Sequence, residues 1–275
     1  MSNRGSRFVS FVVGFLVLGT LLSVVGCQTA DAPAGDQISV AGSTTVQPLA
    51  EKLVENYPED VEITVQGGGS SVGVKSAGNG TVDIGMASRE VKESEFDEFP
   101  ELVVFTIARD GIAIAAHPDV PVDALTLDQT RAIFAGEIAN WSEVGGPDEL
   151  ITVVAREEGS GTRAAFEELV MGDTLVTEDA LLQPSNGAVR TTVSTTPYAI
   201  GYLSFGYLDD STKAIAVDGV EPTEENAGSG EYPVVRPLNM MTNGEPEGAV
   251  ADFLDYILSQ EGQAIVVDEG YIAVQ

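Results

Sequence analysis

The sequence predicts an α/β protein in which mainly parallel strands are flanked by helices on both faces. From residue 38 onward, short apolar strands alternate with helical segments that are apolar on one face, an alternation typical of parallel sheets. The chain has 275 residues, of which 43% are hydrophobic. That length and content are enough to bury a sizeable core in one large domain or in two lobes.

Each element follows from its own pattern. In the first half, apolar residues at helical spacing predict a helix over 46–57, between strands at 38–41 and 61–65. Buried-strand runs follow at 82–86, 102–108 and 111–116. In the second half, the same reasoning predicts helices at 126–135, 162–170 and 250–258. Strands are expected at 151–155, 199–203 and 213–217.

The N-terminal segment is typical of an export signal. Arg4 and Arg7 precede an apolar run over residues 8–25, and Cys27, the single cysteine, follows directly. The sequence Val24-Val25-Gly26-Cys27 resembles the lipobox of bacterial and archaeal lipoproteins. We therefore expect residues 1–26 to be a lipoprotein signal peptide and Cys27 to be lipidated. Residues 27–37 would be a flexible tether outside the cytoplasmic membrane. A retained membrane-spanning helix is the alternative.

The charge balance restricts the partners. The chain carries 13 Lys and Arg against 43 Asp and Glu, a net charge of −30, and removal of residues 1–26 makes it −32. Nothing supplies a basic face for nucleic acid. Many acids with few lysines resemble secreted proteins of high-salt organisms, in which screening makes such self-repulsion tolerable.

Four Gly/Ser/Thr-rich segments follow predicted strands and are expected to begin helices. They are Gly42-Ser43-Thr44-Thr45, Gly67-Gly68-Gly69-Ser70-Ser71, Ala87-Ser88-Arg89 and Arg156-Glu157-Glu158-Gly159-Ser160-Gly161-Thr162. Helix N-termini present unpaired N–H groups, and small hydroxyl residues there add donors without crowding a ligand. Taken singly, each segment is explained by helix capping. Together they predict an anion site, at which the Arg156 guanidinium would make a bidentate contact with the anion.

Catalysis and nucleotide binding have little support. Gly68 and Gly73 have the separation of a phosphate-binding loop, but Val74 intrudes before Lys75-Ser76. His117 is the only histidine, and the sequence lacks a nucleophile elbow and any cluster with metal-ligand spacing. We expect no enzyme activity, cofactor or metal.

At these segments the sequence closely resembles the short form of the PstS family, the phosphate-binding receptors of phosphate ABC transporters. The motifs occur in family order from about residue 38 to the C-terminus: residues 42–48, 67–75, 82–89, 133–141, 156–166, 199–202 and 259–263. The resemblance implies a type II periplasmic-binding-protein fold with two α/β lobes, 38–110 plus 235–275 and 111–234, joined by hinge strands. It also implies a monomer that closes on inorganic phosphate and delivers it to a membrane ABC permease.

The resemblance also implies the ligand contacts. They are Thr44, Thr45, Ser70 and Ser88 from the first lobe and Arg156, Ser160, Gly161 and Thr162 from the second. Trp141 has two interpretations, a core aromatic, which we favour, or a residue near the cleft.

One departure bears on specificity. Long-form members place an Asp after the third-segment Ser, where it accepts the phosphate proton, but Arg89 stands there in this chain. Asp110 is the preferred replacement as proton acceptor, and Asp83 is the weaker one. If neither reaches the ligand, sulfate, molybdate or tungstate becomes a stronger alternative to phosphate. Two rival functions are a phosphate-sensing or surface protein not coupled to transport, and a hydrolase of phosphorylated compounds.

Overall fold

The structure, a computed structural model, describes residues 37–274. The predicted signal peptide, most of the tether and Cys27 lie outside these residues. The strands are β1 (Gln37–Gly42), β2 (Glu62–Gly67), β3 (Ile84–Ala87), β4 (Leu102–Ala116), β5 (Ala124–Leu125), β6 (Thr152–Arg156), β7 (Leu181–Gln183), β8 (Ala199–Ser204), β9 (Lys213–Val217) and β10 (Val235–Asn243). The α-helices are α1 (Val46–Glu55), α2 (Ser70–Gly78), α3 (Glu93–Glu98), α4 (Leu127–Ala135), α5 (Gly161–Phe166), α6 (Asn186–Thr195), α7 (Glu224–Ser229), α8 (Gly248–Leu258) and α9 (Gln260–Asp268).

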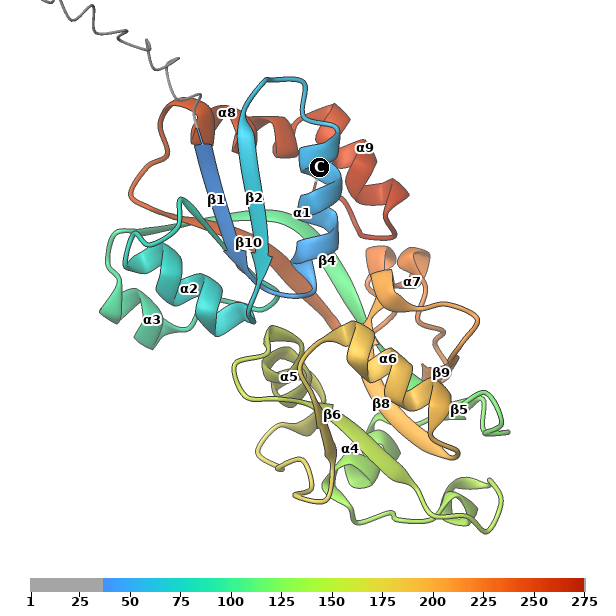
Figure 1. The fold of residues 1–275 in the computed structure, drawn as a ribbon. Coiled ribbons are helices and arrows are strands. Elements are labelled where there is room, and N and C mark those ends of the chain that lie inside the picture. Colours follow the sequence, from blue (N-terminus) through green and yellow to red (C-terminus); the bar gives the residue numbers. More distant parts are fainter. Residues whose placement is uncertain (1–36, 275) are drawn as a thin grey trace, which may run out of the picture. The chain divides into compact units, whose positions relative to one another are not determined.

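The strands form one mixed sheet, whose main path runs in the order β2-β1-β3-β10-β4-β8-β6-β7 (Figure 1). Beside this path, β9 pairs with β4, and β5 pairs with β9. At one end β1 pairs in parallel with β2 and β3, and at the other end β6 pairs in parallel with β7 and β8. Between them, β10 and β4 pair antiparallel with their neighbours. This arrangement confirms the predicted α/β class.

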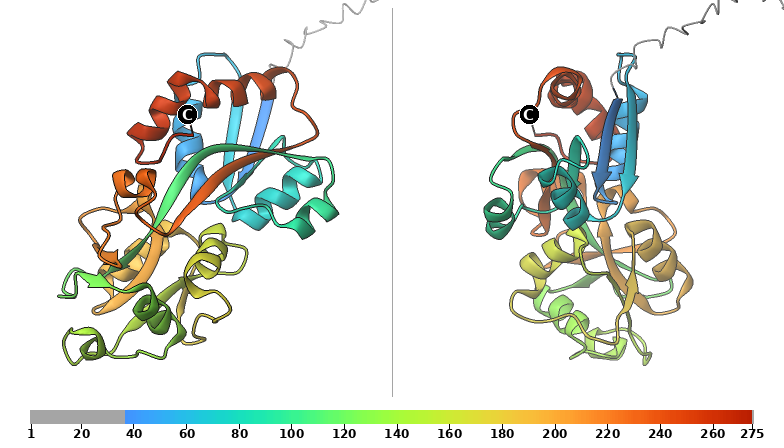
Figure 2. Two further views of the ribbon diagram at one scale, coloured as in Figure 1. Left: turned by 180° about the vertical axis from the view of Figure 1, so that it is seen from behind. Right: turned by 60° about the vertical axis from the view of Figure 1, so that its left-hand side comes forward.

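The strand β4 links the two ends of the sheet. Residues 102–111 pair with β10, and residues 112–116 pair with β8. The sequence suggested two separate runs, 102–108 and 111–116, but the strand continues through Arg109 and Asp110 because both stay in register with β10. Figure 2 shows β4 and β10 side by side between the two groups of elements.

Two hydrophobic clusters form the main core. One takes its buried members from residues 112–234, and the other takes them from residues 38–108 and 238–271. Helix α1 buries Val46, Leu49, Ala50 and Leu53, the face predicted from its periodicity. For description we call 38–110 with 235–275 the first lobe and 111–234 the second lobe, following the division expected from the sequence. No helix within residues 37–274 has the length and hydropathy needed to cross a bilayer.

Candidate anion site

The predicted segments meet at the carboxyl ends of β1, β3 and β6. The turn after β1 carries Thr44 and Thr45, β3 leads into Ser88, and β6 ends at Arg156. Turns at the carboxyl ends of parallel strands are where α/β sheets bind ligands. Figure 1 shows the starts of α2 and α5 facing this region from the two lobes.

The two lobes contact each other along a surface that we call the seam. It is formed by Thr44, Thr45, Ser70 and Ser88 of the first lobe and Arg156, Gly161 and Thr162 of the second. Thr45 Oγ1 lies 3.1 Å from Thr162 Oγ1, and Arg156 donates to Thr44 Oγ1 over 3.2 Å. Gly161 packs so closely on Ser70 and Ser88 that an added Cβ would overlap Ser70 Oγ and lie 2.6 Å from Ser88 Oγ.

Three serine side chains of the first lobe form a connected group at the seam. Ser43 donates to Ser88 Oγ over 2.9 Å, and the Ser88 N–H donates to Ser70 Oγ over 3.0 Å. Across the seam, Ser160 caps α5 by accepting the N–H of Arg163 over 3.2 Å. The structure therefore brings the predicted residues of both lobes into one small region.

Several backbone N–H groups at the seam have no acceptor within residues 37–274. They belong to Thr44, Ser70, Gly161 and Thr162. The last three residues are buried, and a buried N–H without a partner costs about 1–3 kcal/mol. Such groups converging from turns of both lobes are suited to the oxygens of a small anion.

Arg156 is a buried cation without a carboxylate partner among residues 37–274. Its guanidinium donates to neutral oxygens only, the carbonyls of Gln183 and Pro184 and the hydroxyls of Thr44 and Thr162. Only 2% of the residue is exposed. Burial lowers the pKa of Arg156 to about 10, so the side chain is still charged at neutral pH. A buried charge of this kind is costly unless an opposite charge joins it.

A second guanidinium reaches neighbouring groups of the seam, on Ser88 and Thr45. Arg236 on β10 donates to Ser88 O over 3.1 Å, and its other terminal nitrogen lies 3.4 Å from Thr45 Oγ1. Asn186, at the start of α6, donates to Thr45 Oγ1 over 2.8 Å. Neither residue was predicted from the sequence. The signal at Arg236 was a charged residue in an apolar setting, Val235-Arg236-Pro237. The signal at Asn186 was one more polar strand-to-helix turn, Ser185-Asn186-Gly187.

Comparison with known proteins identifies the family. The PBP superfamily domain model matches residues 28–261. The phosphate-binding protein PstS of Bacillus subtilis is 39% identical, covering 88% of this chain and 82% of its own length. The chain belongs to the PstS family. The PstS protein of Borreliella burgdorferi is 30% identical, over 86% of this chain and 90% of its own length.

Two solved structures show the same fold. A substrate-binding protein assigned to a phosphate ABC transporter of Clostridium perfringens, solved with bound phosphate, superposes with a TM-score of 0.84 at 42% identity. The match covers 87% of this chain and all of that one. An ABC-type phosphate transport receptor from Vibrio cholerae gives a TM-score of 0.72 at 36% identity, covering 86% of this chain and 99% of that chain. The two-lobed type II fold implied by the resemblance is thereby confirmed.

Asp110, the candidate proton acceptor, is fully engaged within this PstS chain. Its Oδ2 accepts two bonds from Arg236, at 2.8 and 3.1 Å, and its Oδ1 accepts from Ser204 Oγ and the Phe205 N–H. Burial raises the pKa of Asp110, and the Arg236 guanidinium with the two other donors opposes that shift. Since a carboxylate offers about four lone-pair positions, Asp110 serves here as the counter-ion of Arg236.

The other carboxylate considered, Asp83, lies away from the seam. It is exposed, sits just before β3, and accepts from the backbone and hydroxyl of Ser39 on β1. The site residue Ser88 follows the opposite end of β3.

Arg89 does not face the seam as an anion ligand. Its guanidinium makes a two-pronged ion pair with Glu95, at 2.7 and 2.8 Å. The expectation that Ala87-Ser88-Arg89 begins a helix was wrong, because α3 starts only at Glu93, after Lys92. Ser88 therefore presents its hydroxyl from the end of a strand.

Trp141 is a core residue, as expected. It is fully buried in the second-lobe cluster, and its Nε1 donates to Tyr198 O over 2.9 Å.

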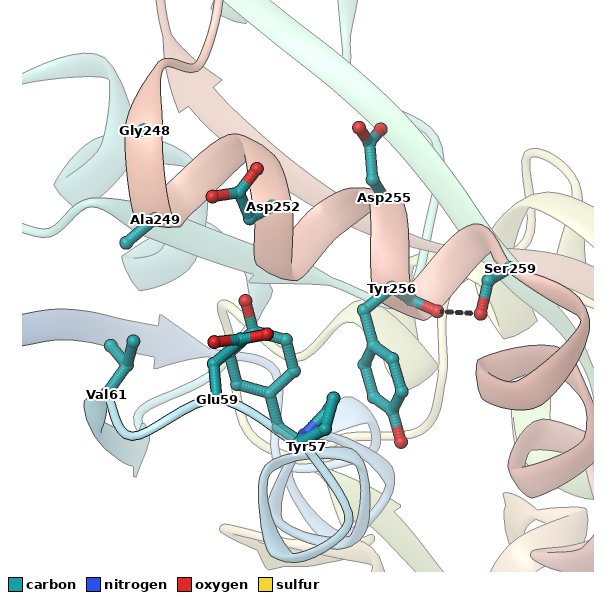
Figure 3. Close-up of a pocket in the computed structure, with 10 residues that line it drawn as sticks. Tyr57, Glu59, Val61, Gly248, Ala249, Asp252, Asp255, Tyr256 and Ser259 are labelled. Carbon is teal, nitrogen blue, oxygen red and sulfur yellow. Dashed lines mark hydrogen bonds between the residues drawn. The ribbon is translucent and has the colours of Figure 1, made fainter.

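A large cavity of the first lobe does not suit an anion. It has a volume of about 730 Å³ and lies between α8 and the loop that follows α1 (Figure 3). Glu59, Asp252 and Asp255 line it, and Figure 3 shows Glu59 and Asp252 on opposite walls. Three carboxylates with no basic residue in the lining repel a phosphate dianion. Within residues 37–274, no group of three or more His, Cys, Asp or Glu side chains is placed to hold a metal ion.

Proposed function

We propose that this protein is an extracytoplasmic receptor that captures inorganic phosphate between its lobes and delivers it to an ABC-type permease. The observation that carries the proposal is Arg156, a buried guanidinium with no carboxylate partner among the described residues, facing a seam of N–H and hydroxyl donors. The names of the PstS relatives and the phosphate bound in the Clostridium perfringens structure support phosphate as the anion.

The proposed contacts divide between the lobes. Thr44, Thr45, Ser70 and Ser88 bind from the first lobe, and Arg156 with the turn Ser160-Gly161-Thr162 closes from the second. Arg236 and Asn186 join them, because both already donate to Thr45 Oγ1. The lobes would move about β4 and β10, which cross between them. Opening at the seam admits the anion, and closure replaces its water with fixed donors.

We infer binding without chemistry on the ligand. Among the described residues, the seam hydroxyls have no histidine base beside them. His117 follows the far end of β4, seven residues beyond Asp110, about 23 Å away at ~3.3 Å per residue. We also propose that Cys27 carries a lipid that anchors the protein to the outer face of the cytoplasmic membrane, and that the protein acts as a monomer.

The ligand is tested by calorimetric titration with phosphate, sulfate and molybdate between pH 5 and 8 at high salt. We expect phosphate to bind with a dissociation constant of about 1 µM or lower, equivalent to about −8 kcal/mol. Sulfate is the strongest competitor, because Asp110 is saturated by Arg236, Ser204 and Phe205 and Asp83 accepts from Ser39, so neither carboxylate is placed to accept the phosphate proton. Equal binding of sulfate would make the chain a general oxyanion receptor. No binding of any of the three would point to a surface or sensing protein, and turnover of a phosphomonoester would favour the hydrolase.

Closure is tested at Gly161. Replacing Gly161 with alanine places a methyl group against Ser70 and Ser88 across the seam, so we expect phosphate affinity to fall about tenfold, or about 1.4 kcal/mol. Gly228→Ala on α7 is the matched control, because its nearest neighbour would be Ile272 at 3.9 Å. Calorimetry giving equal affinities for the two variants would show that the lobes do not close at Gly161.

A further inference from the structure

A second cavity crosses the seam directly outside the proposed phosphate site. Its volume is about 720 Å³, and its walls come from both lobes. Ser71 and Arg89 follow the site residues Ser70 and Ser88 in the chain, and Ser160 belongs to the cavity wall and to the site. An anion that enters this cavity therefore reaches the proposed phosphate site directly, because the residues that line the cavity adjoin the site. We call this cavity the vestibule.

Basic side chains are concentrated at the vestibule, although the protein has few of them. Lys75 and Lys92 line it and are exposed. Most Lys and Arg side chains of the described chain lie within 4.0 Å of a carboxylate. Within residues 37–274, the basic side chains without a carboxylate at this distance are Lys75, Lys92, Arg109 and Arg156.

The other charges of the vestibule largely cancel. Arg163 pairs with Glu167, which also lines the vestibule, over 2.7 Å. Arg89 pairs with Glu95, also over 2.7 Å. Glu158 is the remaining carboxylate in the lining. Two lysine ammonium groups against one carboxylate leave a local positive surplus, in contrast to the carboxylate-lined cavity of the first lobe.

This surplus matters because the whole chain repels its ligand. A net charge of −30 slows the approach of a phosphate dianion, whereas cations at the mouth of a cleft raise the local anion concentration. We propose that Lys75 and Lys92 make the vestibule a first, transient binding site that feeds oxyanions to Arg156. This inference rests on the proposed function and adds the route by which the ligand arrives.

The experiment is stopped-flow phosphate binding at low ionic strength, followed by intrinsic fluorescence. We expect the Lys75→Gln/Lys92→Gln double variant to bind phosphate about three- to tenfold more slowly, with an unchanged dissociation rate. The difference should vanish at about 1 M salt, where the Debye length is about 3 Å. The control is Lys52→Gln/Lys213→Gln, which removes the same charge from two lysines paired with Glu55 and Asp123 outside the vestibule.

An unchanged association rate in the vestibule variant would overturn the inference and leave the proposed function standing. Equal slowing in the control would also overturn it, because net charge alone would then explain the effect. Absence of phosphate binding in the unmodified protein would overturn the proposed function itself.

Discussion

Replacing Arg156 with alanine is expected to weaken phosphate binding at least about thirtyfold, equivalent to about 2 kcal/mol. Loss of one partner of a buried, hydrogen-bonded charge pair typically costs about 2–5 kcal/mol. In the phosphate-free protein Arg156 has only neutral acceptors among the described residues, so the ligand is the anion that would pair with it. Calorimetry on the purified variant measures the change.

Two further variants separate charge from geometry at this position. Arg156→Lys keeps the positive charge but loses the planar fork, and we expect it to bind phosphate with intermediate affinity. Arg131→Ala, which removes a surface arginine paired with Asp128 in the same lobe, should bind like the unmodified protein. Phosphate should also raise the melting temperature of the unmodified protein far more than that of Arg156→Ala. Equal phosphate affinity in Arg156→Ala and Arg131→Ala would remove Arg156 from the site.

Replacing Asp110 with asparagine is expected to lower the free energy of unfolding by about 3–5 kcal/mol in the absence of phosphate. The Asp110–Arg236 pair is essentially inaccessible to solvent, with side chains 0% and 1% exposed. Removal of one charge leaves the other buried and uncompensated. The pair also links β4 to β10 where both strands pass between the lobes.

Urea denaturation measures this loss, with Asp128→Asn as the control. Asp128 pairs with Arg131 but is 89% exposed, so its loss should cost far less. The double variant Asp110→Leu/Arg236→Met should recover much of the stability, because an apolar pair can replace a buried ion pair. If Asp110→Asn unfolds at the same urea concentration as Asp128→Asn, the buried pair does not stabilise the hinge.

Much of the site could be predicted because its residues lie in short segments with a local signature. Gly42 to Thr45 and Arg156 to Thr162 each join a strand to a helix, and small residues there allow the backbone to approach a ligand closely. The amphipathic face of α1 was equally plain, since helical spacing depends only on neighbouring residues.

The missed parts depend on tertiary contacts. Strand β10 was not predicted because the polar residues Arg236 and Asn239 interrupt its apolar pattern. Both residues are buried, and their side chains are hydrogen-bonded to other strands and turns. The pairing of Arg236 with Asp110 joins residues 126 positions apart, so no local pattern reveals it. Helix α6 was not predicted because its sequence has few strongly apolar residues, although Val189 and Val193 are buried.

The most direct measurement of the central claim is a crystal structure of the protein grown with phosphate. We predict one tetrahedral anion at the seam, within hydrogen-bonding distance of the Arg156 guanidinium, the Thr162 N–H and the Ser88 hydroxyl. An anion found only beside Lys75 and Lys92, or a seam that stays empty at saturating phosphate, would contradict this prediction.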